Sequence, residues 1–596
     1  FHQPYLERLL RVGDEWIVHG KVEASGRRLQ IIHPEIERLS ESSADDEDHG
    51  APDLGLNMGR IVPIYPVTEG MSQRWLRRIV NTVLSQEDLF AHEVLPETIR
   101  KTHQMPTFEW AVQQLHFPDT WDDLEAAKRR LSFEELFLLQ LTFAIRRSRL
   151  KARVKPQRYQ PDGPLRKAFF HQLPFTLTPS QQQVMAELVE DMRRPHPMLR
   201  LLQGDVGCGK TVVAAALMII AVQSGYQAAI MVPTELLAAQ HGRLLRGYCE
   251  GLGIAVRVVS QGLTAKQRET ILTEIARGKV QLVVGTHALI EAPVSFHNLA
   301  LVIIDEQHKF GVVQRKTFVT KGQQPDVLVM TATPIPRTLA LSLYGDVAVS
   351  TISQLPPGRR AVHTLWYREA QRTQAYELMR QHLCCGRQGY VVYPLIETTT
   401  RQDLKTATAM ATTLQTEIFP EFRVALLHGQ MRSREKDAIM RSFVDGRIHL
   451  LVSTVIVEVG LDVPNATLML IEHPERFGLA QLHQLRGRIG RSHFASTCLL
   501  ISDTSDELAT QRLQAFVETT DGFQLAERDL QLRGPGELLG RRQHGWMRFH
   551  LADLGRDTEL LELAREEASA LIAHDPALRE PSLERLRERL GVRSSG

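Results

Sequence analysis

The chain has 596 residues, too many for one hydrophobic core, and this length suggests roughly four domains. Charged residues make up 23% and hydrophobic residues 43%, which is ordinary for a globular protein, and a net charge of +2 excludes a strongly basic surface over the whole molecule. Five cysteines without C-x-x-C pairs indicate neither a disulfide framework nor a zinc site, and no apolar run reaches the ~20 residues of a membrane span. We therefore expect a cytoplasmic protein with no membrane partner. The first residue is Phe1, whereas a natural chain begins with Met. We therefore expect this sequence to be an N-terminally truncated part of a longer chain.

Residues 1–60 contain short β-like runs at 15–22 and 28–32, followed by a Ser-, Asp- and Glu-rich loop. Strands this short and few predict part of a small barrel. Phe1 and Tyr5 lie four residues apart at its start. They could stack on nucleic-acid bases, but composition alone favours a place in the core.

Residues 61–168 have a helical pattern, and we interpret them as a helical linker domain. Trp75, Ile79 and Val83 are spaced by four, and Ser132-x-x-Glu135 predicts a capping box at the start of a helix. The segment 146–155 carries six cations in ten residues. Such a run is usually a solvated face, although it also suits a phosphate backbone.

Residues 169–350 alternate strand-like and helix-like runs, which predicts a parallel sheet with helices on both faces. Ligands of such sheets bind beyond the carboxyl ends of the strands. The expected strands are 199–202, 229–232, 281–284, 301–304 and 327–330.

A second alternating series occupies residues 351–504 and has no phosphate loop of its own, so we expect it to complete the site of the first. Residues 351–360, with Pro356-Pro357-Gly358, predict a hinge between the two series. Residues 505–596 read as mainly helical. The expected strands of the second series are 389–393, 424–427, 450–453, 467–471 and 497–501.

A complete G-x-x-x-x-G-K-[ST] phosphate loop stands between the strand expected at 199–202 and a helical run at 212–222. Glycines let the backbone wrap a polyphosphate, Lys210 reaches the β/γ oxygens, and Thr211 ligates Mg²⁺. The sequence therefore predicts binding of a nucleoside triphosphate. The loop consists of Gly204, Asp205, Val206, Gly207, Cys208, Gly209, Lys210 and Thr211.

Two acids and two arginines supply the remaining chemistry of hydrolysis. Asp305 and Glu306 follow the strand expected at 301–304; beside a phosphate loop, Asp305 would hold Mg²⁺ and Glu306 would activate the attacking water. In the second series, Arg488 and Arg491 stand three apart with Gly490 between them and can face the nucleotide as arginine fingers. Taken alone, an acid after a strand can be a helix cap, and an Arg-rich helix start is mostly a surface feature.

Several of these motifs together resemble those of superfamily 2 helicases, and more closely the RecG family of branched-DNA helicases. The helicase motifs are Gly204–Thr211, Asp305–His308, Thr331–Arg337 and Gln484–Arg491. The segments that resemble the RecG family are 1–6, 61–70, 131–137, 201–210, 233–241, 475–479, 521–523, 526–530 and 533–537.

The resemblance implies an α/β fold with two RecA-like parallel-sheet lobes, at 169–350 and 351–504. A partial OB-type wedge at 1–60 and the helical linker at 61–168 would precede them, and a helical-hairpin region at 505–596 would follow. The implied function is ATP-dependent remodelling of branched DNA, by regressing stalled forks and migrating Holliday junctions, in recombination and repair. ATP and Mg²⁺ are the implied cofactors. The implied partners are branched duplex DNA and single-stranded-DNA-binding protein. The resemblance also implies a monomer that is associated with the bacterial nucleoid.

The same resemblance assigns roles to individual positions. Gln181 would read the adenine edge, Gln484 would join the catalytic set with Arg488, and Phe1 and Tyr5 would stack on bases at the fork. The positions expected to bind DNA, or to couple hydrolysis to it, are Thr234, Gln240, Thr286, His287, Thr331, Thr333, Thr454, Glu458, Gly460, Asp462, Arg512, Arg533 and Gln543.

Three other interpretations stay open at this point. A fragment of a transcription-repair coupling factor would share the helical hairpin, although that family usually has Glu where Gln307 stands. A non-motor switch would bind ATP without needing Glu306, Arg488 and Arg491. An RNA helicase would share the two lobes, but the hairpin that follows them favours duplex DNA.

Overall fold

The computed structural model describes residues 15–591 with internal gaps. The residues left out within that range are 21, 26–27, 32–34, 39–55, 58, 69, 86–92, 261, 292, 307–311, 333–335, 337–344, 346, 357–360, 395–400, 455–462, 491–493 and 534–548. The chain divides into two compact units, 1–145 with 545–596 and 146–544. No helix in the described ranges is both long enough and apolar enough to cross a membrane.

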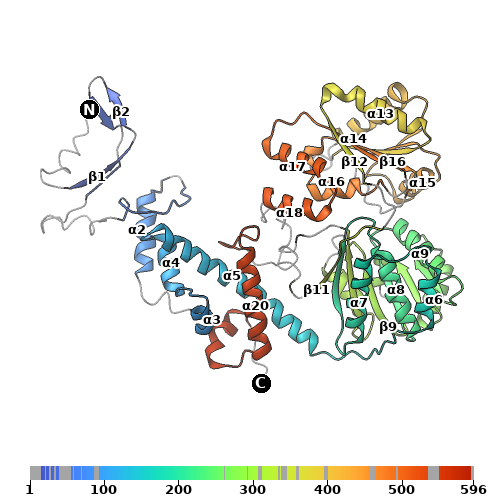
Figure 1. The fold of residues 1–596 in the computed structure, drawn as a ribbon, viewed down its shortest axis with the longest axis horizontal. Coiled ribbons are helices and arrows are strands. Elements are labelled where there is room, and N and C mark those ends of the chain that lie inside the picture. Colours follow the sequence, from blue (N-terminus) through green and yellow to red (C-terminus); the bar gives the residue numbers. More distant parts are fainter. Residues whose placement is uncertain are drawn as a thin grey trace. The chain divides into compact units, whose positions relative to one another are not determined.

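The first unit combines short strands with helices from both ends of the chain. Strands β1 (Trp16–His19) and β4 (Glu35–Arg38) pair antiparallel, as do β2 (Val22–Ser25) and β3 (Arg28–Ile31). The C-terminal helix α20 lies beside α5 and α3 (Figure 1), and Glu567 of α20 contacts His103 at 2.8 Å. The helices are α2 (Gln73–Leu84), α3 (Glu97–Thr102), α4 (Phe108–His116), α5 (Trp121–Lys151), α20 (Thr558–His574) and α21 (Glu584–Arg589).

The capping box predicted at Ser132 is wrong, because Ser132 is buried within the long helix α5. The start of α5 is instead marked by Thr120, whose hydroxyl accepts a hydrogen bond from the backbone N–H of Asp123. Glu135 serves a distant segment: its carboxylate accepts the N–H groups of residues 550–552 at 2.9–3.1 Å. The spacing predicted the start of a helix at Ser132, whereas Glu135 in fact joins the C-terminal segment to α5.

The second unit begins with an entirely parallel seven-stranded sheet in the order β11-β5-β10-β9-β6-β8-β7, which we call lobe 1 together with its helices. Helices α7, α8 and α9 lie against this sheet, and α6 packs on α8 and α9 (Figure 1). The strands are β5 (Leu199–Gly204), β6 (Gln227–Met231), β7 (Val256–Val259), β8 (Leu282–Gly285), β9 (Leu299–Ile304), β10 (Asp326–Thr331) and β11 (Ala348–Ile352). The helices are α6 (Pro164–Gln172), α7 (Pro179–Arg193), α8 (Lys210–Gln223), α9 (Glu235–Cys249), α10 (Ala265–Ala276) and α11 (Val312–Val319).

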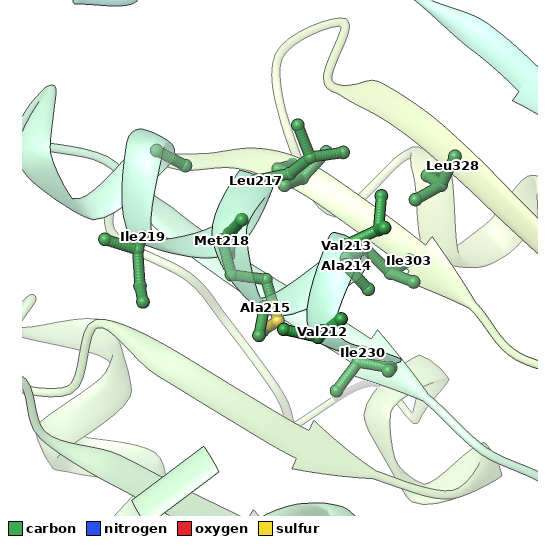
Figure 2. Close-up of a cluster of buried hydrophobic side chains, with 14 of the residues drawn as sticks. Val212, Val213, Ala214, Ala215, Leu217, Met218, Ile219, Ile230, Ile303 and Leu328 are labelled. Atoms are coloured by element: carbon green, nitrogen blue, oxygen red, sulfur yellow. The ribbon is translucent and has the colours of Figure 1, made fainter. Parts of the chain in front are cut away.

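Helix α8 lies at the centre of this lobe's core. Its residues from Val212 to Ala221 are apolar on every side and all buried, as expected of a helix enclosed by protein. Figure 2 shows side chains of α8 gathered against Ile230, Ile303 and Leu328 of strands β6, β9 and β10. This packing fixes the start of α8, and with it the phosphate loop, relative to the central strands.

The second unit continues with a six-stranded parallel sheet in the order β12-β17-β16-β13-β15-β14, which with its helices we call lobe 2. The strands are β12 (His363–Tyr367), β13 (Gln388–Val392), β14 (Val424–Leu427), β15 (Leu450–Ser453), β16 (Ala466–Glu472) and β17 (Thr497–Ile501). The helices are α13 (Arg372–Cys384), α14 (Arg401–Thr413), α15 (Ser433–Val444), α16 (Leu479–Arg486), α17 (Glu507–Glu518) and α18 (Gly522–Arg533).

All ten strands expected in the two alternating series are confirmed, within a few residues at their ends. The hinge predicted at 351–360 needs correction, because Thr351 and Ile352 belong to β11 and pair with Gln203 and Gly204 of β5. Strand β11 lies at the edge of its sheet. An edge strand needs fewer buried positions than a central one, so its apolar pattern is weaker.

The cationic run at 146–155 ends in a buried ion pair. Lys155 donates to both carboxylate oxygens of Asp326 at 2.9 and 2.8 Å, and both side chains are 0% exposed. Asp326 also accepts the N–H of Met198 at 2.6 Å. Lys155 therefore does not serve a phosphate backbone; it ties the segment after α5 to the first residue of β10.

Burial outweighs the mutual attraction in the pKa values of both partners. Desolvation lowers the pKa of Lys155 and raises the pKa of Asp326, in each case against the charge of the other partner. A buried ion pair of this kind adds little net stability, whereas removal of one partner leaves an uncompensated buried charge.

We expect Lys155→Met to lower the free energy of unfolding by about 3–5 kcal/mol, because Asp326 then loses its counter-charge. Adding Asp326→Asn should recover most of that loss, since the amide oxygen still accepts the N–H of Met198. Denaturant unfolding of single and double variants measures both effects. Arg193→Ala, which breaks an exposed pair with Asp162, is the control and should cost less than about 1 kcal/mol. A double variant as unstable as the single one would contradict the argument.

Candidate active site

The phosphate loop connects β5 to α8, as the motif requires. Two of its glycines, Gly207 and Gly209, have φ angles of 77° and 89°, which side-chain-bearing residues rarely adopt. A Cβ atom on Gly209 would also lie 2.3 Å from the Nε2 atom of Gln181. The backbone of the loop therefore has the curvature that lets successive N–H groups face an anion.

Lys210 begins α8, and its side chain lies along the loop. Its Nζ donates to the carbonyl oxygens of Gly204 at 2.6 Å and Asp205 at 3.0 Å. The ammonium is therefore already held at the loop from which it is predicted to reach a polyphosphate. Lys210 and its neighbour Thr211 both line the cavity described below.

Gln181 is 2% exposed and is bonded to the loop through its side-chain amide. Its Oε1 accepts the N–H of Thr178, and its Nε2 donates to the carbonyl of Cys208 at 2.8 Å. Gln181 also lines the cavity. Its geometry supports the shape of the phosphate loop, while its contact with adenine stays a prediction.

The two predicted acids follow β9 directly. Asp305 has its N–H bonded to the carbonyl of Met231 on β6, and its Oδ2 lies 3.2 Å from Nε2 of His241 on α9. Glu306 has a φ of 52°, a left-handed conformation that costs a residue with a Cβ some strain. Its N–H donates to Oδ1 of Asp305 at 3.0 Å, and its Oε2 lies 3.5 Å from the N–H of Ala332.

The surroundings shift the pKa values of Asp305 and Glu306 in opposite directions. Burial alone would raise the pKa of Asp305, but the hydrogen bond and charge of His241, with the charge of Lys210, hold it below its usual value. Burial and the neighbouring charge of Asp305 raise the pKa of Glu306, against the charges of Lys210 and Arg488. An ionised acid beside one with raised proton affinity suits a cation ligand next to a general base.

A cavity of about 450 Å³ brings the two lobes' predicted catalytic residues together. Gln484 on α16 and Arg488 just after it contribute from lobe 2. The volume lies within the range of small-molecule sites. The predicted residues that line the cavity are Gln181, Val206, Gly207, Gly209, Lys210, Thr211, Gln240, Asp305, Glu306, Gln484 and Arg488.

The residues predicted to contact or sense DNA occupy several places. Thr234 caps α9 by accepting the N–H of Leu237, whereas Gln240 faces the nucleotide cavity. Arg512 on α17 donates to the carbonyl oxygen of Glu475 at 2.6 Å. Four others stand at or just beyond the carboxyl ends of β8, β10 and β15: Thr286, His287, Thr331 and Thr454. The roles of all of these residues stay predictions.

Other predicted site residues fall at the limits of the described structure. Arg533 is the last residue of α18, and only its backbone is described. The predicted residues outside the described ranges are Phe1, Tyr5, Thr333, Glu458, Gly460, Asp462, Arg491 and Gln543.

Three residues at the site were not predicted. His241 contacts Asp305, and His483 on α16 lies 2.5 Å from Asp205 of the phosphate loop. Arg486 contacts His483 in turn. His241 and His483 each stand directly beside a residue that was selected, Gln240 and Gln484. Proximity to a motif was therefore the available signal, but no spacing rule pairs His241 with Asp305, or His483 with Asp205 at a separation of 278 positions.

Family models match most of the chain. The model for the DEAD/DEAH box helicase matches residues 178–341, and the model for the helicase conserved C-terminal domain matches 375–493. The RecG wedge domain matches 1–86, and the C-terminal part of domain 3 of ATP-dependent DNA helicase RecG matches 519–593. The last two matches favour a RecG protein over a fragment of a transcription-repair coupling factor.

Individual relatives agree with these models. The chain is 45% identical to the ATP-dependent DNA helicase RecG of Synechocystis over 94% of this chain and 66% of the relative. It is 40% identical to the RecG helicase of Bacillus subtilis over 99% of this chain and 84% of the relative. A solved structure of RecG bound to a three-way DNA junction matches with a TM-score of 0.72 at 40% identity, over 94% of this chain and 73% of that one.

The two-lobed fold, the composite cavity and these matches agree on one assignment. The nucleotide that the phosphate loop is built to bind is therefore ATP. The chain belongs to the RecG family of ATP-dependent DNA helicases.

Proposed function

We propose that the chain is an ATP-driven motor that moves along duplex DNA and remodels branched DNA. It would regress stalled replication forks and migrate Holliday junctions in recombination and repair. The observation that carries this proposal is the composite cavity, in which Gln484 and Arg488 of lobe 2 face the phosphate loop and acids of lobe 1. Hydrolysis at such a site needs both lobes, so each ATP cycle can move one lobe relative to the other.

The roles within the cavity follow from chemistry and position. Glu306 would take the proton of the attacking water, while Lys210 and Arg488 would stabilise the charge that develops on the transferred phosphoryl group. Thr211 and Asp305 would hold Mg²⁺, because both line the cavity and offer the oxygen ligands that a hard cation prefers. The lowered pKa of Asp305 keeps that carboxylate ionised. Bound Mg²⁺ would neutralise part of the phosphate charge.

The branched substrate is supported by the related RecG that was solved on a three-way DNA junction. We propose that Thr234, Thr286, His287, Thr331 and Thr454 lie on the DNA side of the two lobes, since four of them stand at or just beyond strand carboxyl ends. Arg512, through its bond to the carbonyl of Glu475 after β16, would link the helical hairpin that α17 begins to movement of the lobe 2 sheet. The proposal also includes a monomer on the bacterial nucleoid, with single-stranded-DNA-binding protein as a further partner.

We expect ATP hydrolysis to be stimulated more by a three-way or Holliday junction than by linear duplex of the same length, and least by duplex RNA. Steady-state phosphate release with each nucleic acid measures this order, and an assay of junction unwinding tests remodelling directly. Glu306→Gln is the control, because stimulated hydrolysis at this site should fall together with basal hydrolysis when the proposed general base is removed. Equal stimulation by RNA and branched DNA, with no junction unwinding, would contradict the proposed substrate.

A further inference from the structure

Helix α16 of lobe 2 touches the phosphate loop at two points. Nε2 of His483 lies 2.5 Å from Oδ1 of Asp205, with the two side chains 6% and 18% exposed. One helical turn further on, a Cβ added to Gly487 would lie 2.7 Å from Cβ of Val206. The backbone of the helix end therefore lies directly on the loop, and His483 makes the polar contact beside it.

The second nitrogen of His483 determines the direction of this contact. Nδ1 of His483 lies 3.2 Å from Nη2 of Arg486. A guanidinium has no acceptor, so Nδ1 must accept and Nε2 must carry the proton of the neutral ring. Nε2 therefore donates to the carboxylate of Asp205, and a carboxylate, a neutral imidazole and a guanidinium form one chain of hydrogen bonds.

Arg486 continues this chain to α17. It is 3% exposed, its Nη1 donates to the carbonyl of Phe516 at 2.8 Å, and its guanidinium lies 4.2 Å from the centre of the Phe516 ring. In the other direction, Arg512 of α17 donates to the carbonyls of Glu475 and Phe477, just before α16 begins. Helices α16 and α17 are therefore held together at both ends of α16.

We propose that Asp205, His483 and Arg486 form a relay that sets the position of α17 according to the state of the phosphate loop. A change in loop shape moves Asp205, which reorients His483 and so removes or restores the acceptor of Nη2 of Arg486. Because neighbouring buried hydrogen bonds polarise and strengthen one another, loss of the bond at Asp205 weakens the bond between His483 and Arg486. The proposal rests on the ATP-driven motor described above, in which the hairpin begun by α17 acts on DNA.

A purely structural contact would also explain these distances, and two variants separate the alternatives. In His483→Gln, the amide nitrogen is as many bonds from Cα as Nε2 of histidine, so it can reach Asp205, but no acceptor stands at the δ position that Nδ1 offered to Nη2 of Arg486. In His483→Asn, the amide oxygen can replace Nδ1 toward Arg486, but the bond to Asp205 is lost. Each variant therefore keeps one half of the relay. His363→Gln, at an exposed position on β12, is the matched control.

Hydrogen–deuterium exchange of the backbone amides of α17, Glu507–Glu518, measures whether this helix responds to the phosphate loop in the absence of DNA. Adding a non-hydrolysable ATP analogue should change exchange in α17 of the wild type and of His363→Gln. Both His483 variants should lose that change, although the analogue still protects the phosphate loop. Their dissociation constants for the analogue, measured by fluorescence, should stay within about threefold of the wild type, a difference of less than about 1 kcal/mol.

Stimulation of ATP hydrolysis by junction DNA should fall by about tenfold or more in both variants, as expected for loss of one charge-assisted hydrogen bond. An unchanged α17 response in either variant, or none in the wild type, would overturn the relay. Variants that weaken analogue binding but keep the wild-type ratio of stimulated to basal hydrolysis would also overturn it, since His483 would then only shape the loop. If junction DNA stimulates the wild type while the relay fails, the motor function still stands.

Discussion

Replacement of Glu306 by Gln is expected to lower kcat for ATP hydrolysis by about 10²–10⁴-fold, the contribution of a positioned general base. The amide keeps the shape of the side chain but cannot take a proton from water. Nucleotide affinity should not fall, because the amide removes one negative charge from the site of a polyanion. Burial, and then the neighbouring charge of Asp305, already disfavour the ionised carboxylate and raise the pKa of Glu306.

Phosphate release under steady state and fluorescence titration with an ATP analogue measure these two quantities separately. Glu269→Gln, at an exposed position on α10 of the same lobe, is the matched control and should leave both unchanged. If Glu306→Gln kept kcat within about tenfold of the wild type, less than a general base contributes, another group would have to activate the water. The strained φ of 52° at Glu306 would then need another explanation.

The central strands of both lobes could be predicted from sequence because they are buried on both faces. Residues 301–304 and 450–453, for example, form apolar runs that the structure places inside their sheets. The strands that were missed, β7, β11 and β12, all lie at sheet edges. There the pattern mixes polar and apolar residues, as in Val256–Val259, and only the pairing with a neighbour defines the strand.

Local polar patterns were less reliable, because a side chain's partner need not be its neighbour in sequence. Ser132 and Glu135 have the spacing of a capping box, yet Glu135 binds residues 550–552. Lys155 belongs to a cationic run, yet it pairs with Asp326 inside lobe 1. Each outcome depends on a fold that brings distant segments together, and no residue-by-residue rule contains that information.

The residues of the candidate site also divide into those that a sequence motif predicts and those that only the fold brings together. Lys210, Asp305 and Glu306 were predicted because each belongs to a short motif whose spacing reflects one loop or one strand end. His483 was not predicted because its partner, Asp205, lies in the other lobe. Motifs therefore predict the groups that act on the nucleotide, whereas the contacts that connect the lobes emerge only from the tertiary structure.

Arg488 is the lobe 2 residue whose loss should have the largest effect. It lines the same cavity as Lys210 and Glu306, and its charge opposes part of the rise in the pKa of Glu306 that burial causes. The backbone just before it is fixed, because Gly487 lies against Val206. A cation held in this way is positioned for a γ-phosphate bound at the loop, and an arginine finger contributes about 10³–10⁵-fold to kcat.

We therefore expect Arg488→Ala to lower kcat by about 10³–10⁵-fold, with a much smaller change in nucleotide affinity, because the charge on the γ-phosphate group is spread further in the transition state. Arg488→Lys keeps the charge but loses the planar fork, so it should restore only part of the activity. Arg447→Ala, which removes an exposed arginine of the same lobe, is the matched control. Single-turnover hydrolysis with saturating ATP measures the chemical step directly. A fall of less than about tenfold for Arg488→Ala would mean that Arg488 does not act on the phosphoryl group, since even the lower limit for such a finger is far larger.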